Sequence, residues 1–295
     1  MFGQFFGDYL IKNNIITKSM FDEVIKYQKN TRVKLGLIAV SEKLLTVQQA
    51  DEVNHLQATM DKRFGDIAIE KGYLTDEEVS RLLSLQGNSY LLFVQTMIEK
   101  EFLSLEDIEM HLLAYQKDNN FTCNDIEDLK SGDIDRIVPL FVHIDSSQCK
   151  DLIGLAIRNM IRFISTDMFI EPTYEVKEYS FETLSSQCLK GQYNIFVGFA
   201  AKGKDILAIA NPYAKEEFLE VDEDSYDAVC EFINCINGLF ASKSSHEGID
   251  IDMLPPLSYS NQKLISSDQI FVLPITISGK KIDLLVSIDT VLDVQ

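Results

Sequence analysis

The sequence contains no tryptophan, and in 295 residues it has only four histidines and five cysteines. The histidines have no spacing that suits a metal site; they are His55, His111, His143 and His246. The cysteines are odd in number and scattered, and no Cys-x-x-Cys pair occurs. The scarcity of these residues argues against a metal centre and a disulfide framework, and we expect a protein of the reducing cytoplasm.

Basic residues are also scarce, since 27 Lys and Arg face 46 Asp and Glu and the formal net charge is −19. This balance argues against nucleic acids and anionic membranes as general partners, because both require a basic surface. No apolar run approaches the roughly 18 residues of a membrane span. The N-terminal residues lack the basic region of a signal peptide. A local basic patch remains compatible with a small phosphorylated ligand.

The first 118 residues contain a repeat with a period of 29 residues. Its three columns are Gly7, Gly36 and Gly65; Thr17, Thr46, Thr75 and Ser104; and Gln28, Gln57 and Gln86. Each repeat reads as a short helix, a tight connection and a longer helix that opens on the Thr or Ser as its N-cap. One helix pair cannot cover its own apolar face, so the pairs must pack together. We predict an all-helical domain over residues 1–118.

A polar segment over residues 119–135 predicts a linker, and residues 136–295 follow a different pattern. We expect strands over 137–144, 169–179, 193–201 and 206–210, and a hairpin of 269–277 with 281–288. Two long helices, 149–165 and 225–242, lie between the strands in the sequence. Hairpin strands with intervening helices predict an α+β domain with a mainly antiparallel sheet.

The most informative segment is the helix expected over 225–242. At about 100° per residue, Asp227, Glu231, Asn234 and Gly238 share one narrow stripe. Apolar residues fall on the opposite side; they are Val229, Ile233, Ile236 and Phe240. The helix should therefore lie on its domain and present one acid, one carboxamide and one glycine outward. We interpret Asn237, which faces sideways, as structural.

The pattern Asp227-x-x-x-Glu231-x-x-Asn234-x-x-x-Gly238, with Pro255-Pro256 some twenty residues later, resembles the CheC/CheX/FliY group of chemotaxis phosphatases. The single Glu-x-x-Asn copy is most similar to CheX. In a two-site relative the earlier helix would carry a second copy, but Ala156 stands three places before Asn159. The resemblance covers about residues 136–290 and implies a CheX-like fold for the second domain.

This resemblance implies hydrolysis of the aspartyl phosphate of a CheY-like response regulator. Asn234 would position the attacking water, and Glu231 would pair with the regulator's active-site lysine. Asp227 and Gly238 would belong to the docking face, where the glycine permits close approach of the two backbones. The Mg²⁺ would be the regulator's, with no cofactor bound in this domain. The resemblance also implies a homodimer.

Two other interpretations of the same residues stay open. Glu and Asn three residues apart are common on exposed helix faces, so the pair is compatible with a surface that has no chemistry. Related flagellar-switch domains imply a second alternative, a binding adaptor that docks a regulator without changing the lifetime of its phosphate.

The helical repeats resemble the MshEN module of secretion and pilus ATPases. One copy runs Arg63-Phe64-Gly65, Ala68, Gly72, Val79, Leu83, Gln86, and the preceding copy runs Lys34-Leu35-Gly36, Ala39, Lys43, Ala50, Asn54, Gln57. The resemblance implies cyclic di-GMP binding, with Lys34, Gly36, Gln57, Arg63, Gly65 and Gln86 in the site. The preceding copy departs from the pattern at Lys34, Lys43 and Asn54. The alternative is a helical docking or dimerisation module, in which the glycines only allow tight packing.

Overall fold

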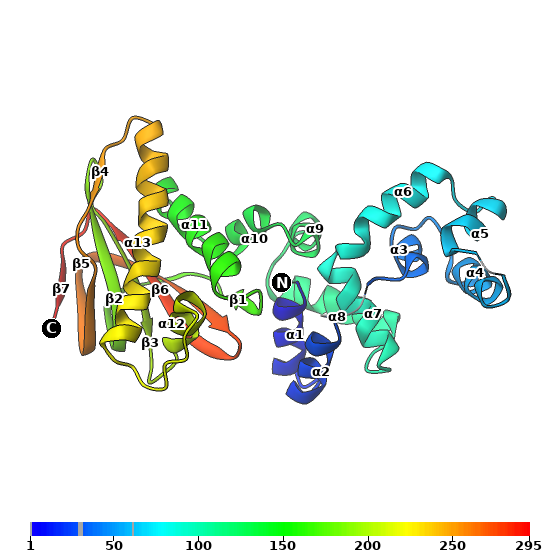
Figure 1. The fold of residues 1–295 in the computed structure, drawn as a ribbon, viewed down its shortest axis with the longest axis horizontal. Helices are drawn as coiled ribbons and strands as arrows, with labels where there is room; N and C mark the ends of the chain where they lie inside the picture. Colours follow the sequence, from blue (N-terminus) through cyan, green and yellow to red (C-terminus); the bar gives the residue numbers. More distant parts are fainter. Residues whose placement is uncertain (1, 29–31, 61) are drawn as a thin grey trace. The chain divides into compact units, whose positions relative to one another are not determined.

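The computed structural model describes residues 2–28, 32–60 and 62–295 (Figure 1). The chain divides into two compact units, Met1–Asp133 and Ile134–Gln295. The first unit is helical, and the second combines helices with an antiparallel sheet. This confirms the predicted fold class, α+β with an N-terminal helical part. None of the helices in the described ranges is long and apolar enough to cross a membrane.

The described part of the first unit contains nine α-helices and one short 3₁₀-helix. They are α1 (Phe2–Lys12), α2 (Lys18–Gln28), α3 (Leu35–Ser41), α4 (Val47–Thr59), α5 (Phe64–Glu70), α6 (Asp76–Ser84), η1 (Leu85–Gly87), α7 (Ser89–Glu99), α8 (Leu105–Asp118) and α9 (Cys123–Ser131). The repeat accounts for the first eight α-helices as four pairs. Each predicted cap is confirmed: Thr46, Thr75 and Ser104 form capping boxes, and the Thr17 hydroxyl accepts a hydrogen bond from the Met20 amide.

The four helix pairs associate in two sets that do not follow chain order. The second and third pairs share an apolar core, which includes Ile38, Val53, Ile67 and Leu82. The first pair packs instead against the fourth, through contacts of α1 and α2 with α7 and of α1 with α8. Aromatic rings form this second contact; they are Phe2, Phe6, Tyr9, Tyr90, Phe93 and Tyr115. The predicted packing between helix pairs is therefore present, with an order that the repeat does not reveal.

The repeated glycines mark close contacts between helices. A Cβ atom on Gly65 would lie 2.8 Å from Cγ1 of Val79, and one on Gly36 would lie 3.0 Å from the ring of Phe64. A Cβ on Gly7 would overlap the ring of Phe21. The repeated glycine thus marks, in each of these three pairs, a point where a side chain would press against a neighbouring one.

The linker predicted over 119–135 is wrong in its central part. Residues Cys123–Ser131 form α9, which begins with a capping box at Thr122 and ends at Gly132 in the left-handed conformation, with φ 72°. Ile126 and Leu129 are buried, and α9 contacts α7 and α1. The polar composition reflects an exposed helix face and two helix caps, which resemble loop residues in the sequence.

The second unit contains four α-helices and seven strands. They are α10 (Ile134–Phe141), α11 (Ser147–Phe163), β1 (Met168–Ile170), β2 (Tyr174–Gly191), β3 (Ile195–Ala201), α12 (Leu207–Ala214), α13 (Glu223–His246), β4 (Ile251–Met253), β5 (Leu257–Ile277), β6 (Lys280–Ile288) and β7 (Leu292–Val294). The two long helices and the final hairpin are confirmed. The hairpin turns at Ser278 and Gly279, both with positive φ, as a tight two-residue turn requires.

All strand pairs in the sheet are antiparallel, in the order β1-β5-β6-β3-β2-β4. The long strand β5 pairs with β2 over its first part and with β6 over its last part, so the sheet curls on itself. Helices α11 and α13 pack against one another on one face (Figure 1). Phe199 of β3 stacks on Phe232 of α13, whereas Phe196 and Ala200 belong to a cluster within the curled sheet. Helix α13 therefore packs against the sheet, with contacts to β2, β3, β4 and β5.

Three strand assignments in the sequence prediction are wrong or incomplete. Residues 137–144 fall largely in the helix α10, whose buried residues Ile137, Val138 and Phe141 follow a helical spacing. Residues 206–210 open the helix α12. Short apolar runs do not distinguish a strand from a buried helix, which explains both errors. The third error is β2, which continues to Gly191.

Candidate functional site

Helix α13 carries the candidate site and is fixed firmly at its start. Its N-cap is Asp222, whose carboxylate accepts a hydrogen bond from the Ser225 amide, while Ser225 Oγ accepts one from the Asp222 amide. Lys243 and His246 lie in the last turn, where positive charge suits the helix dipole. These caps and the sheet beneath hold the helix as a rigid support for its exposed face.

The predicted stripe on α13 has the expected exposure. Asp227, Glu231 and Asn234 are exposed, and Gly238 is partly exposed. The opposite face is buried; it comprises Val229, Ile233, Ile236 and Phe240. Glu231 and Asn234 therefore lie one turn apart on an accessible surface, which is the arrangement that the helical spacing predicted.

The carboxamide of Asn234 is held by a residue from the sheet. Gln187 of β2 is buried, with 2% of its surface exposed, and its Nε2 donates to Asn234 Oδ1 at 2.9 Å. The same Nε2 donates to the backbone carbonyl of Leu254 at 2.8 Å. Leu254 immediately precedes Pro255-Pro256, so one glutamine joins the two separated parts of the sequence pattern.

Asn237 completes this group of amides from below. It is fully buried, and its Nδ2 donates to Gln187 Oε1 at 2.9 Å. Its Oδ1 is buried without a hydrogen-bond partner among the described residues. The structure thus agrees with a structural role for Asn237 and shows what it holds, namely Gln187.

Glu231 has no comparable anchor. Its carboxylate has no hydrogen bond or ion pair to any residue in the described ranges, although the Tyr213 hydroxyl lies 3.5 Å from its backbone carbonyl. Burial raises the pKa of that hydroxyl, and nearby Cys235 and Glu231 raise it further. The Glu231 carboxylate is therefore available to a cation supplied from outside the chain.

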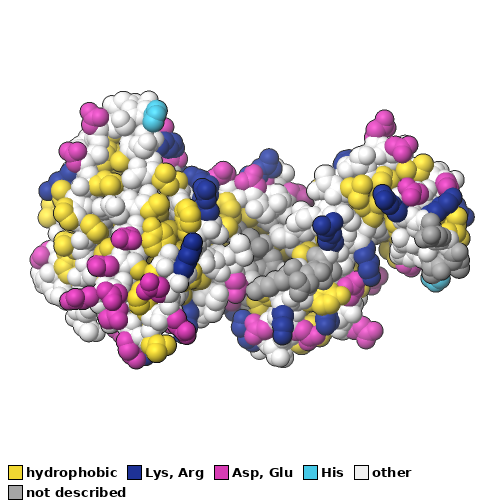
Figure 2. Space-filling model, in the orientation of Figure 1, with side chains coloured by type: hydrophobic (Ala, Val, Ile, Leu, Met, Phe, Trp, Pro, Cys, Tyr) yellow, Lys and Arg dark blue, Asp and Glu magenta, His cyan; other side chains and the backbone are white. Residues whose placement is uncertain are grey.

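Acidic side chains surround the first turns of α13. Figure 2 shows them gathered over this end of the second unit; exposed members on α13 and at its cap are Asp222, Glu223, Asp224, Asp227 and Glu231. A docking partner with a basic surface would be attracted to this region.

Gly238 is not required by the packing of the chain itself. A Cβ atom there would lie 3.9 Å from the nearest atom, Cε of Met253, which is an ordinary van der Waals distance. A glycine inside a helix costs about 1 kcal/mol relative to alanine. Packing within the chain therefore does not require a glycine at this position. Close approach of a partner backbone would require one.

The earlier long helix, α11, carries no second site. Asn159 is buried, and its Nδ2 donates to the Leu155 carbonyl within the same helix. The position one turn before it is the buried Ala156. The single Glu-x-x-Asn pattern of the sequence corresponds to a single exposed pair in the structure.

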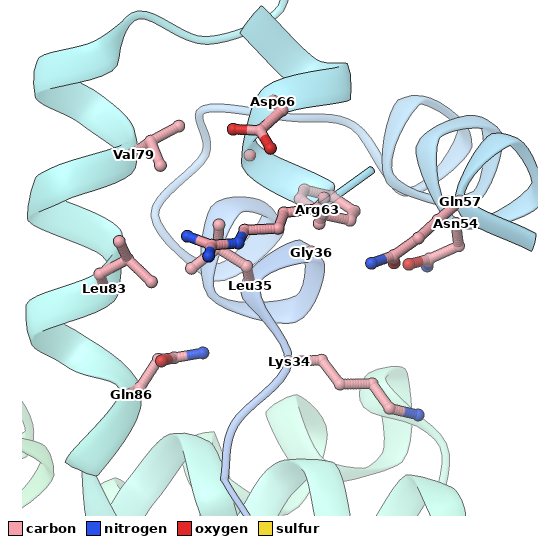
Figure 3. Close-up of a pocket in the computed structure, with 12 residues that line it drawn as sticks. Lys34, Leu35, Gly36, Asn54, Gln57, Arg63, Asp66, Val79, Leu83 and Gln86 are labelled. Atoms are coloured by element: carbon pink, nitrogen blue, oxygen red, sulfur yellow. The ribbon is translucent and has the colours of Figure 1, made fainter. Parts of the chain in front are cut away.

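A cavity of about 690 Å³ in the first unit brings together all six residues of the predicted nucleotide site (Figure 3). Lys34, Gly36, Gln57, Arg63, Gly65 and Gln86 all line it, with Asn54, Val79 and Leu83 among the others. In Figure 3 the helix carrying Val79 and Leu83 faces Asn54 and Gln57 of α4, with Arg63 between them. Both repeat copies therefore contribute to one site.

Two of these residues already have partners. Lys34 Nζ lies 2.5 Å from Glu99 Oε1, and Gln86 Nε2 donates to the Val33 carbonyl at 3.0 Å. Gln86 thus holds the backbone just before α3 in place, independently of any ligand. No hydrogen bond or ion pair engages the Arg63 guanidinium among the described residues, which leaves this cation for an anionic ligand.

The sequence analysis missed Gln187, although it is central to the site. It lies in a stretch of β2 in which Thr183, Ser185, Ser186 and Gln187 are all buried. Buried polar residues hide the alternation by which a strand is recognised. No group of three or more His, Cys, Asp or Glu suited to a metal occurs in the described part of the chain.

Comparison with known proteins yields one family model and several solved structures of low sequence identity. No curated protein sequence matches the chain. A CheC-like superfamily protein from Shewanella sp. PV-4 is 16% identical, with a TM-score of 0.44 over 50% of this chain and 99% of that one. A chemotaxis protein CheX from Desulfovibrio desulfuricans is 11% identical, with a TM-score of 0.43 over 49% of this chain and 100% of that one. The CheX of a CheX–CheY–BeF₃–Mg²⁺ complex from Borrelia burgdorferi is 15% identical, with a TM-score of 0.38 over 48% and 97%.

The family model described as Chemotaxis phosphatase CheX matches residues 185–276. This range begins just before Gln187 and includes Glu231, Asn234, Gly238 and Leu254. The predicted resemblance to CheX is confirmed over these residues: this segment of the second unit matches the CheX family model, and the exposed pair on α13 lies within it.

Proposed function

We propose that this protein is a phosphatase that hydrolyses the aspartyl phosphate of a CheY-like response regulator. The observation that carries the proposal is the exposed pair on α13, a Glu231 carboxylate without a partner in the described ranges and an anchored carboxamide at Asn234. The match to a family described as a chemotaxis phosphatase supports it.

The reaction needs little chemistry from this chain, because phosphoryl transfer depends mainly on positioning and electrostatics. The regulator brings the aspartyl phosphate and its Mg²⁺. Asn234 holds a water in line with the bond to the leaving carboxylate. The water oxygen bonds to phosphorus, the phosphorus–oxygen bond to the aspartyl group breaks with its electron pair going to the carboxylate, and the proton lost by the water passes to a phosphate oxygen or to solvent. The products are inorganic phosphate and the free aspartate.

Glu231 would direct the approach of the regulator. A response regulator's active-site lysine is a cation close to the phosphorylated aspartate, and a salt bridge to Glu231 would align the two proteins. The acidic surface around the first turns of α13 would add long-range attraction that salt screens. In this proposal Glu231 serves docking and Asn234 places the water.

The test is phosphate release from a phosphorylated CheY-like regulator with Mg²⁺, with and without the full chain. We expect the wild-type chain to accelerate release, and Asn234→Ala to lower that acceleration about 100-fold or more. Ser245→Ala is the matched control, because Ser245 is exposed on the same face of α13, three turns away. Full activity of Asn234→Ala would contradict the mechanism.

The same assay separates the enzyme from a binding adaptor. An adaptor would bind the beryllofluoride-loaded regulator and leave the phosphate lifetime unchanged. We expect Glu231→Ala to weaken this binding, whereas Asn234→Ala should bind with nearly wild-type affinity. Binding without any acceleration by the wild-type chain would favour the adaptor.

We further propose that the first unit binds cyclic di-GMP, because the cavity unites both repeat copies and contains the Arg63 cation, which has no partner among the described residues. Arginine can pair bidentately with phosphate. Calorimetry with the dinucleotide should give a binding heat that Arg63→Ala removes. Arg81→Ala is the control, since Arg81 belongs to the same unit but pairs with Glu42 and does not line the cavity. If the wild-type chain gives no binding heat, the remaining interpretation of the first unit is a docking or dimerisation module.

A further inference from the structure

Three carboxamides from two elements form a continuous series of hydrogen bonds beneath the candidate site. Asn237 Nδ2 donates to Gln187 Oε1, and Gln187 Nε2 donates to Asn234 Oδ1 and to the Leu254 carbonyl. Gln187 and Asn237 are buried, whereas Asn234 is exposed. The series therefore runs from the core of the unit to its surface.

The direction of the series is fixed at Leu254. A backbone carbonyl only accepts hydrogen bonds, so the Gln187 group that faces it must be the Nε2 amine. The second hydrogen of that amine then points at Asn234, so Asn234 must accept this hydrogen bond through its side-chain oxygen. The Oδ1 atom of Asn234 consequently faces inward, and its Nδ2 amine is the end left toward solvent.

From this geometry we infer that Gln187 is a positioning residue for the proposed phosphatase reaction, holding Asn234 so that its Nδ2 donates to the attacking water. The inference rests on the proposed function. A lone pair of the water accepts this hydrogen bond, and the other lone pair remains free to attack phosphorus. Without Gln187 the exposed carboxamide could rotate by 180° and exchange its donor for its acceptor.

The position of Gln187 explains how one residue affects distant parts of the site. Its backbone belongs to β2, where Gln187 lies opposite Val197 in the sheet register, and the Leu254 amide donates to the neighbouring Cys188 carbonyl at 2.9 Å. The segment before Pro255 is thus tied to β2 twice, by backbone and by side chain. Asn234 therefore takes its orientation from a side chain held in a paired strand of the sheet.

The activity test uses two substitutions of Gln187 in the full chain. Gln187→Glu keeps the shape and the acceptor for Asn237 Nδ2 but lacks the donor, and Gln187→Met removes all three hydrogen bonds. For both variants we expect kcat for regulator dephosphorylation to fall about tenfold or more, with KM nearly unchanged. Ser185→Ala is the control, because Ser185 is buried on the same face of β2 and bonds Ser258 instead.

A purely structural role predicts a different result. In either variant, any loss of kcat would then follow the loss of folded protein measured by circular dichroism. That finding, or a wild-type kcat in a variant that folds fully, would overturn the inference while leaving the phosphatase itself established by the wild-type rate.

A second measurement does not depend on activity. Hydrogen exchange of the side-chain amides, followed by nuclear magnetic resonance of the ¹⁵N-labelled chain, should show slow exchange at Gln187 Nε2 and Asn237 Nδ2 and fast exchange at Asn234 Nδ2. Protection at Asn234, or fast exchange at Gln187, would overturn the orientation. If the wild-type chain does not accelerate dephosphorylation, the proposed function fails, and this measurement still decides whether Gln187 orients Asn234.

Discussion

The repeated glycines of the first unit and Gly238 of α13 differ in how closely their surroundings are packed. In the first unit a side chain at Gly7, Gly36 or Gly65 would press against a neighbouring helix, so the reason for each glycine lies within the unit. In the second unit Gly238 has room for a side chain and still lies in mid-helix beside Asn234. The contrast separates glycines that internal packing requires from one that it does not require, and under the proposed function a partner backbone would account for the latter.

The same contrast holds for the polar side chains. The Thr and Ser residues of the repeat satisfy amides at the starts of their own helices, whereas the Glu231 carboxylate satisfies nothing in the described structure. An exposed group without an internal role on a rigid element is a candidate for recognition. Substitutions can test this division directly.

The largest effect is expected for Gly7→Ala, which would place a methyl group against the Phe21 ring. Overpacking a core lowers the free energy of unfolding by about 1–3 kcal/mol, and the higher helix propensity of alanine offsets only part of this loss. We expect a net loss of about 1–2 kcal/mol, measured by denaturant unfolding of the full chain. An unchanged midpoint would show that Phe21 has room to move.

Thr75→Ala should have the next largest effect on stability. Its hydroxyl accepts from the Glu78 amide, and the Glu78 carboxylate accepts from the Thr75 amide. Loss of an N-cap costs about 1 kcal/mol. Thermal unfolding should show the loss, Thr75→Ser should restore most of it, and equal stability of all three proteins would contradict the role of the capping box.

Gly238→Ala should act in the opposite direction. The free chain should gain about 0.5–1 kcal/mol, because alanine favours the helix and its methyl group has space. Affinity for the beryllofluoride-loaded regulator should fall, as shown by titration. A variant that is more stable and binds equally well would remove the argument for close approach at this position.

The smallest effect is expected for Asp283→Asn in the second unit. Asp283 accepts a hydrogen bond from the Tyr179 hydroxyl, and burial raises the pKa of its carboxyl although that bond lowers it. A raised pKa means that the folded state favours the protonated form, so stability is present at low pH and is lost as the pH rises through the folded pKa.

The neutral asparagine should therefore raise the melting temperature at about pH 7, on the order of 1 °C because solvent screens a partly exposed group. Near pH 3, where the carboxyl is protonated in both states, the two proteins should melt nearly together. An effect of equal size at both pH values would exclude the carboxylate charge as its cause.

Most of the helical unit could be predicted from the sequence because its signals are local. Helix caps lie three residues from the amides they satisfy, and the glycine column repeats at a fixed interval. The association of the first pair with the fourth could not be predicted, because it depends on aromatic contacts such as Phe2 with Phe93, 91 residues apart in sequence. Helical periodicity shows which face of a helix is apolar, but not which other helix packs against that face.

The candidate site divides in the same way. Glu231 and Asn234 were found because one helix presents both of them. Gln187 belongs to another element, 47 residues before Asn234, and its neighbours Ser185 and Ser186 obscure the strand. The sequence therefore shows which groups are presented, and the structure shows what orients them.

The pairing of the first repeat with the fourth has a consequence for the chain as it leaves the ribosome. The second and third helix pairs are consecutive and can bury their shared core as soon as both have emerged. The aromatic side chains of α1 must wait for α7 and α8, so the first helix of this unit to be made is among the last to complete its contacts.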